Sequence, residues 1–203
     1  MKDIPGVILA GGKATRMGGG DKGLRDVGGQ RLIDHVIERL SPQCAALAIN
    51  ANGAPGRFAE FALPVLPDSL PDHPGPLAGV LAGLDWAAEQ GFEAIVTAAA
   101  DTPFFPRDLV ARLREAAGPE GLALAGSRDE NGKLWRHPTF GLWPVALRDD
   151  LRAALEGGLR KIVLWTDAHQ AGLAEFPAGP FDPFFNVNTP EDIAEAERLL
   201  EAL

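Results

Sequence analysis

The stretch from Val7 to Leu24, VILAGGKATRMGGGDKGL, joins a short apolar run to a loop of glycines and cations. The apolar residues are typical of a strand buried on both faces. Glycines after such a strand let backbone N–H groups approach an anion closely. Arg16 and Lys22 lie in the same loop, where arginine binds phosphate as a planar fork and lysine as a point charge. The stretch therefore predicts a phosphate-binding loop.

The spacing within this loop excludes two common nucleotide-binding motifs. The chain has no GxxxxGK followed by Ser or Thr, and no GxGxxG directly follows the apolar run. What remains is LAGG, then Arg16-Met17-Gly18, then Asp21-Lys22. This pattern resembles the signature of nucleotidyltransferases, which bind a nucleoside triphosphate and release pyrophosphate. The alternative is a glycine-rich surface turn with solvated charges.

The charge of the chain is unevenly distributed. The 203 residues carry a net charge of −9, yet residues 1–31 contain six basic and three acidic side chains. An acidic protein is not a general nucleic-acid binder, but a local positive site suits an anionic ligand. The length suffices for one domain with a full core.

The composition also predicts the compartment. Cys44 is the one cysteine, so no disulfide forms within the chain, as is typical of a reducing compartment. The first residues lack a signal-peptide pattern, and the apolar runs are shorter than a membrane span. We therefore expect a cytoplasmic protein that binds no membrane.

Apolar runs alternate with residues at helical spacing along the chain, which predicts strands and helices in alternation. The expected strands are 4–9, 46–49, 64–66, 93–99, 122–125, 136–143 and 173–176. The expected helices are 32–40, 77–89, one starting at Pro106, 144–155 and one starting at Thr189-Pro190. This order predicts an α/β fold: a single Rossmann-like domain with a mostly parallel sheet and helices on both faces.

Polar residues follow four of the expected strands: Gly11 and its loop, Asn50, Asp68 and Asp101. Ligands of open α/β sheets bind beyond the carboxyl ends of the strands, so these four positions predict one site. Asp101, in DTP after a buried strand, is a candidate Mg²⁺ ligand, because Mg²⁺ prefers one or two carboxylates plus phosphate oxygens. The alternative role for Asp101 is an Asx turn or a helix cap.

Three more polar segments are candidates for the site. Asp68 begins a loop that reaches a helix through Gly75, where free N–H groups suit a base, ribose or phosphate. Asn186 and Asn188 are expected on one face of a strand, where Asn188 could complete a metal site opposite Asp101 or bind a substrate amide. Either asparagine could equally be a turn or cap residue. His137, which precedes a proline, is expected to be structural.

Five segments together resemble the molybdenum cofactor guanylyltransferases, over about residues 6–192. They are LAGGKATRMGGGDKGL, NAN at 50–52, PDSLPDHPGPLAG, DTPFFP, and HPTFGLW with FFNVNTPED. The resemblance implies that GMP is transferred from GTP to molybdenum-molybdopterin, giving the guanine dinucleotide form and pyrophosphate. It is weakest at 144–184.

The resemblance also implies roles for individual residues and for the two halves of the chain. The GTP-binding residues would be Leu9, Ala10, Gly11, Gly12, Lys22, Asn50, Asp68 and Asp101. The catalytic residues would be Arg16, Lys22 and Asp101, with Asp101 binding Mg²⁺. The molybdopterin-binding residues would be Gly75, Asn186 and Asn188. Residues 1–105 would form the GTP-binding half and 106–203 the molybdopterin-binding half, with transient contacts to proteins that deliver or accept the cofactor.

Three other functions remain open at this point. A cytidylyltransferase acting on the same pterin, or a sugar-phosphate nucleotidyltransferase, would share the opening loop. A non-catalytic nucleotide-binding adaptor would have less need of Asp101. An NAD-binding oxidoreductase is disfavoured because its fingerprint does not follow the first strand.

Overall fold

The structure is a computed structural model that describes residues 3–11, 20–70, 75–177 and 179–201. Its strands are β1 (Gly6–Leu9), β2 (Asp26–Val27), β3 (Gln30–Arg31), β4 (Leu47–Asn50), β5 (Val65–Leu66), β6 (Ala94–Ala99), β7 (Ala123–Arg128), β8 (Leu134–Pro144) and β9 (Gly172–Phe176). Its α-helices are α1 (Leu32–Leu40), α2 (Pro76–Glu89), α3 (Leu109–Glu115), α4 (Arg148–Glu156), α5 (Ile162–Ala168) and α6 (Pro190–Glu201). Short 3₁₀ helices are η2 (Lys22–Leu24), η3 (Ser41–Gln43), η4 (Pro55–Phe61) and η5 (Val145–Leu147).

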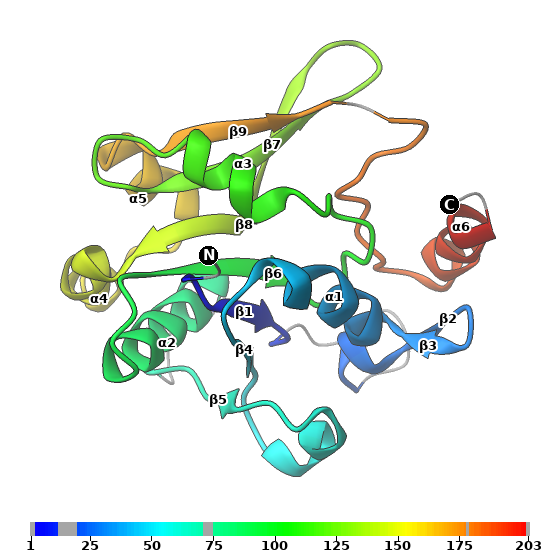
Figure 1. The fold of residues 1–203 in the computed structure, drawn as a ribbon, viewed down its shortest axis with the longest axis horizontal. Helices are drawn as coiled ribbons and strands as arrows, with labels where there is room; N and C mark the ends of the chain where they lie inside the picture. The colour runs from blue at the N-terminus through cyan, green and yellow to red at the C-terminus, as the bar shows by residue number, and fades with distance from the viewer. Residues whose placement is uncertain (1–2, 12–19, 71–74, 178, 202–203) are drawn as a thin grey trace.

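The main sheet has the strand order β5-β4-β1-β6-β8-β7-β9 (Figure 1). β5, β4, β1 and β6 pair in parallel, β7 and β9 pair in parallel, and β8 is antiparallel to both of its neighbours. Because β8 reverses direction between them, β6 and β7 point the same way. The carboxyl ends of β1, β4, β5, β6, β7 and β9 therefore lie at one edge of the sheet, and the expected mostly parallel α/β fold is confirmed.

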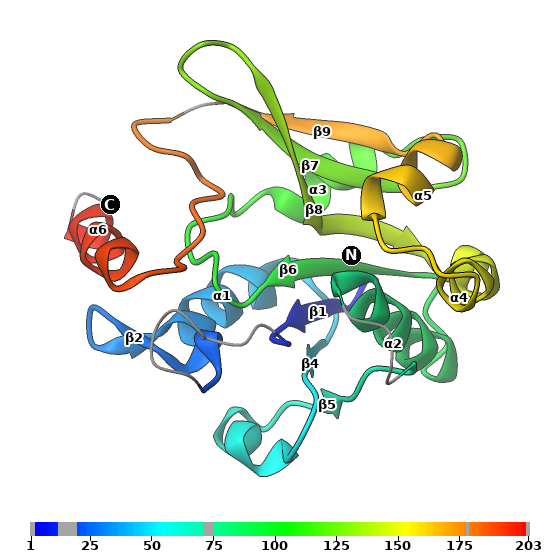
Figure 2. The ribbon, with the colours of Figure 1, turned by 180° about the vertical axis from the view of Figure 1, so that it is seen from behind.

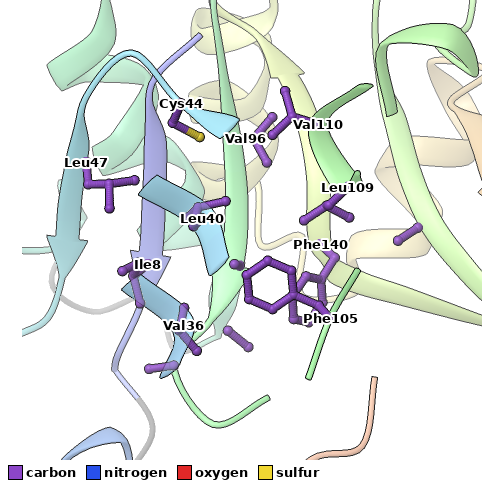
Figure 3. Close-up of a cluster of buried hydrophobic side chains, with 14 of the residues drawn as sticks. Ile8, Val36, Leu40, Cys44, Leu47, Val96, Phe105, Leu109, Val110 and Phe140 are labelled. Carbon is purple, nitrogen blue, oxygen red and sulfur yellow. The ribbon is translucent and has the colours of Figure 1, made fainter. Parts of the chain in front are cut away.

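Successive residues of β1 contact opposite faces of the sheet, each covered by helices. Ile8 packs in a core cluster with Val36 and Leu40 of α1 and Leu109 of α3 (Figure 3). Val7 packs in a second cluster with residues of α2, α4 and α5. Both residues are fully buried, as period-two alternation in a strand between two helical layers requires. The expectation of helices on both faces is thus confirmed.

A bulge of three residues in β8 separates the outer part of the β7–β8 hairpin from the part that pairs with β6. Leu124 pairs with Gly141 but Ala125 pairs with His137, so Pro138, Thr139 and Phe140 are extra residues on β8. Beyond this bulge the hairpin extends away from β6 (Figure 2). The aromatic ring of Phe184 contacts His137, Phe140 and Phe176 there.

A third core cluster holds α6 against the N-terminal half of the chain. Val27, Leu32, Phe104, Val187 and Ala196 are buried together. Val187 therefore anchors the segment that leads into α6 beside the segment that follows β6.

Several local expectations were wrong. Asn186 and Asn188 lie in an irregular segment and not in a strand, and the N–H of Val187 between them donates to the carbonyl of Asp101. The helix expected from Pro106 begins at Leu109, and the one expected over 144–155 begins at Arg148 after η5. The β2–β3 hairpin, η4 and α5 were not predicted.

In the part of the chain that the structure describes, every helix is too short or too polar to cross a lipid bilayer.

Candidate active site

Lys22 connects the two ends of the chain at the carboxyl edge of the sheet. Its Nζ donates to Asp101 Oδ2 at 2.5 Å, to Asn186 Oδ1 at 3.0 Å and to Asn188 Oδ1. Lys22 is only 9% exposed, so these oxygens replace most of the water around the ammonium. A charge this buried needs such partners. The structure therefore brings Lys22, Asp101, Asn186 and Asn188 into one cluster.

Lys22 is held in place by its neighbour Gly23. A Cβ on Gly23 would lie 2.9 Å from Cβ of Ala100, closer than side chains approach one another. The absence of that Cβ lets η2 lie directly against Ala100, which follows β6 and precedes Asp101. Gly23 is a positioning residue that the sequence pattern did not single out.

The two asparagines are oriented by the buried residue between them. The backbone N–H of Val187 donates to the carbonyl of Asp101 at 2.9 Å, and the side chain of Val187 is fully buried. Asn186 and Asn188, on either side of this buried residue, both accept from Lys22, so the valine that faces the core fixes the segment on which both amides lie. Asn188 also donates from Nδ2 to the carbonyl of Asn186 at 3.1 Å.

A capping box at the start of α6 fixes the end of this segment. Asp192 Oδ2 accepts from the N–H of Asn188 at 2.7 Å and of Thr189 at 2.9 Å, while Thr189 Oγ1 accepts from the N–H of Asp192 at 3.2 Å. The Thr-Pro-Glu-Asp start signal of the sequence is thus confirmed, and it directly positions Asn188.

A second polar cluster lies on the other side of β1. Asp68, just beyond β5, accepts from Asn50 Nδ2 at 2.9 Å and from Asn52 Nδ2 at 2.7 Å. The backbone N–H of Asp68 donates to Asn52 Oδ1 at 2.9 Å, and Asn50 Nδ2 also reaches the carbonyl of Leu66. The network orients Asn50 and Asp68 together, and Asn52 is a third member that was not among the predicted site residues.

The first strand passes between these clusters. The N–H of Ala10 donates to the carbonyl of Asn50, and the N–H of Ala100 donates to the carbonyl of Leu9. Gly11 follows, exposed, with open space where a Cβ would stand. Gly75 precedes α2 with φ of 120°, a conformation that favours glycine. Gly12 and Arg16 lie outside the described residues.

One ion pair near the loop was not predicted. Arg57 Nε lies 2.5 Å from Asp21 Oδ2, both about a quarter exposed. This pair ties η4 to the residue before Lys22, so η4 supports the far end of the glycine loop.

The residues around the Lys22 ammonium have the chemistry of a Mg²⁺ site. They supply one carboxylate and two amide oxygens, all hard ligands that already surround a cation. Among the described residues, no three His, Cys, Asp or Glu side chains are grouped as an all-protein metal cage. A site with few protein ligands fits Mg²⁺, which usually keeps waters and binds substrate phosphates.

Gly79 has no side chain, so Asn50 can occupy the space beside it. Substitution of Gly79 therefore tests the role of Asn50. A Cβ on Gly79 would lie 2.8 Å from Asn50 Cγ and overlap Oδ1. Gly79→Ala should displace Asn50 from Asp68. If Asn50 contacts the nucleoside, as the family resemblance implies, this should raise the dissociation constant for GTP about tenfold, the cost of one or two hydrogen bonds. Calorimetric titration with GTP measures this.

Gly83→Ala is the matched control for that substitution. It lies one turn further along α2 and gains the same helix propensity. Its Cβ would crowd apolar atoms of Ile95 and Val7, at 2.8 and 2.9 Å, so it reproduces the crowding of α2 without displacing Asn50. Its GTP affinity should stay within twofold of the parent protein. Equal affinities of the two variants would show that Asn50 does not contact the nucleotide.

A mostly parallel sheet with Lys22 and Asp101 together at its carboxyl edge is typical of a nucleotidyltransferase. Residues 6–171 match the model of the MobA-like NTP transferase domain, and the chain belongs to this family. It is 53% identical over 199 residues to the molybdenum cofactor guanylyltransferase of Nitrobacter hamburgensis, covering 96% of this chain and 93% of that protein. It is 46% identical to the protein of the same name from Mesorhizobium japonicum, covering 100% of this chain and 98% of that one.

A solved structure has the same fold. Molybdopterin-guanine dinucleotide biosynthesis protein A from Archaeoglobus fulgidus superposes with a TM-score of 0.73, at 24% identity, covering 98% of this chain and 100% of that one. The suspected family and the expected nucleotidyltransferase fold are therefore confirmed.

Proposed function

We propose that this protein transfers GMP from GTP to molybdenum-molybdopterin, releasing pyrophosphate and forming molybdopterin guanine dinucleotide. The relatives that are about half identical over nearly the whole chain bear names for this activity. The structural observation that carries the proposal is the cluster of Lys22, Asp101, Asn186 and Asn188, because it joins the glycine loop to the end of the chain.

In the proposed reaction, a phosphate oxygen of molybdopterin attacks the α-phosphorus of GTP. The bond from that phosphorus to the bridging oxygen breaks, and pyrophosphate leaves with the electron pair. The attacking phosphate is already anionic, so no protein nucleophile or strong general base is needed. The protein contributes positioning and neutralisation of charge.

The two polar clusters divide this work in the proposal. Asn50 and Asp68, with the backbone of Leu9 to Gly11, hold the nucleoside, and Gly12 contacts the triphosphate. Gly75, Asn186 and Asn188 serve the molybdopterin side, and Lys22 and Arg16 neutralise the phosphates. The contacts of Lys22 with both asparagines bring residues of the 1–105 and 106–203 halves together where the phosphates would react.

Mg²⁺ is part of the proposal, with Asp101 as its ligand and the two asparagine oxygens beside it. When bound, the ion would neutralise charge on the triphosphate. Asp101 is positioned for this role because the hydroxyl of Thr102 donates to its Oδ1 at 3.2 Å, while Oδ2 faces Lys22. The proposed setting is cytoplasmic, with transient contacts to proteins that deliver or accept the cofactor.

Incubation with GTP, Mg²⁺ and a molybdopterin-loaded protein should yield the guanine dinucleotide and pyrophosphate. A panel of GTP, CTP, UTP and ATP measures base choice, and we expect turnover with GTP. Faster turnover with CTP would favour the cytidylyltransferase alternative. Nucleotide binding without pyrophosphate release under any of these conditions would favour the adaptor.

A further inference from the structure

A cavity of about 790 Å³ opens at the free end of the β7–β8 hairpin, away from Lys22. Its walls come from three segments: the end of β7, the start of β8 and the chain after β9. The lining includes Ser127, Glu130, Trp135, His137 and Asp182.

The cavity lies at the same edge of the sheet as the candidate active site. β7 and β6 point the same way, so Ser127 near the end of β7 and Asp101 after β6 lie at the carboxyl edge. Only β8 separates the two strands, and the chain itself connects the two sites. Gly179 to Asp182 line the cavity, and Asn186, four residues further along, binds Lys22 together with Asn188. Figure 2 shows the segment from Gly179 to Asn188 running from the side of β9 toward α6.

The cavity presents an aromatic surface. Trp135 is 49% exposed, an unusual state for a large apolar side chain, and its Nε1 is bound to Asp129 Oδ2 at 2.9 Å. The ammonium of Lys133 covers one face of the indole at 3.8 Å, and Lys133 does not line the cavity. The ring is thus held in a fixed orientation, as a stacking surface for a flat ligand requires.

The charges of the cavity disfavour a phosphate. Arg128 is held by both oxygens of Glu175, at 2.5 and 3.0 Å, and Arg136 is held by Asp167 at 2.5 Å. Three carboxylates, of Asp129, Glu130 and Asp182, line the same space. Carboxylates without a surplus of cations repel an anion but accept hydrogen bonds from N–H groups.

A small hydrogen-bond network forms the inner wall. Ser127 is 4% exposed, and its hydroxyl lies 2.8 Å from His137 Nε2 and 3.5 Å from Asp182 Oδ1. Burial lowers the pKa of His137, although the nearby Asp182 opposes this, so the imidazole is neutral at pH 7. Because Asp182 contacts the serine rather than the histidine, these three residues do not form a nucleophilic triad.

We propose that this cavity binds the pterin ring of the acceptor substrate, stacked on Trp135 with its ring N–H and amino groups facing Asp182 and Glu130. This inference rests on the proposed function and deepens it. The phosphate of the same substrate then extends along the 179–188 segment to Lys22. His137 and Ser127 are positioning residues, since they hold Asp182 and the inner wall.

The test uses the full chain and two readouts, the dissociation constant for unsubstituted pterin by equilibrium dialysis and the KM for molybdopterin. Trp135→Ala and Asp182→Asn should each raise both values about tenfold or more, the usual loss for one stacking contact or one charged hydrogen bond. The amide introduced by Asp182→Asn retains an oxygen for the N–H of Phe184, which Asp182 binds at 2.9 Å, so the turn is kept.

Leu164→Ala is the control, since Leu164 is 60% exposed and lies on α5 outside this cavity. It should leave both values unchanged, and all three variants should keep the KM for GTP within twofold. Unchanged values in Trp135→Ala and Asp182→Asn, or displacement of pterin by inorganic phosphate, would overturn the inference. If the parent protein forms no dinucleotide, the proposed function is wrong. The dissociation constants for pterin still show, in that case, whether the cavity binds a pterin ring.

Discussion

Replacement of Asp101 by asparagine should lower the rate of dinucleotide formation at least about a hundredfold. Asparagine keeps the shape of Asp101 and one oxygen, which can accept from either Thr102 or Lys22, but it removes the negative charge that a divalent ion requires. Losing one preorganised charge contact to the reacting phosphates typically costs two to three orders of magnitude in rate. Steady-state rates at saturating substrates, together with thermal unfolding, measure the effect.

Asp108→Asn is the control for this substitution. Asp108 is an exposed aspartate seven residues further along, before α3, and lies outside the cluster around Lys22. It should keep the parent rate. Raising the Mg²⁺ concentration should partly restore Asp101→Asn if the lost step is metal binding. A rate within threefold of the parent protein would mean that Asp101 serves only to hold Lys22.

The sequence was sufficient to predict which edge of the sheet carries the candidate site. Strand β1 is a continuous apolar run, and α1 carries apolar residues at helical spacing, so both could be located. Asn50 is the last residue of β4, and Asp68 and Asp101 lie two residues beyond β5 and β6, so all three lie at strand ends as expected. These strand ends could be predicted because each one depends on residues that are close to it in the sequence.

The contacts between residues that are far apart in the sequence could not be predicted in the same way. Lys22 and Asn186 are 164 residues apart, and nothing local to either shows that they meet. Their contact depends on the buried packing of Val187 and Phe104, which is a tertiary effect. The pairing of β8 also depends on tertiary structure, because its three-residue bulge follows from how Phe140 and Phe184 pack.

The β2–β3 hairpin is a different case, because its signal was present and was missed. Gly28 and Gly29 separate two short runs, and both have positive φ, of 64° and 80°. Two such glycines are a hairpin turn signal. Strands of only two residues were too short for their alternation to support that signal.

Substitution of Lys22 by methionine should weaken GTP binding about tenfold to a hundredfold and lower the rate of transfer by more. Methionine fills much of the same buried volume but carries no charge. In the structure the ammonium is bonded to Asp101, Asn186 and Asn188, so it stands where phosphate charge would accumulate. A charge-assisted contact with phosphate contributes roughly 1.5–3 kcal/mol. Calorimetric titration with GTP gives the affinity, and rapid-quench single turnover gives the rate of transfer.

The control is Lys161→Met, which removes the same charge from an exposed residue before α5. It should change neither the affinity nor the rate. Lys22 also holds the asparagines, so its two roles must be separated by combining Lys22→Met with Asn186→Ala. If Lys22 mainly neutralises phosphate, Asn186→Ala alone keeps GTP affinity, and the double variant is no weaker than Lys22→Met. If Lys22 mainly holds the segment before α6, Lys22→Met keeps its GTP affinity and loses affinity for molybdopterin instead, and the phosphate role assigned to Lys22 would be wrong.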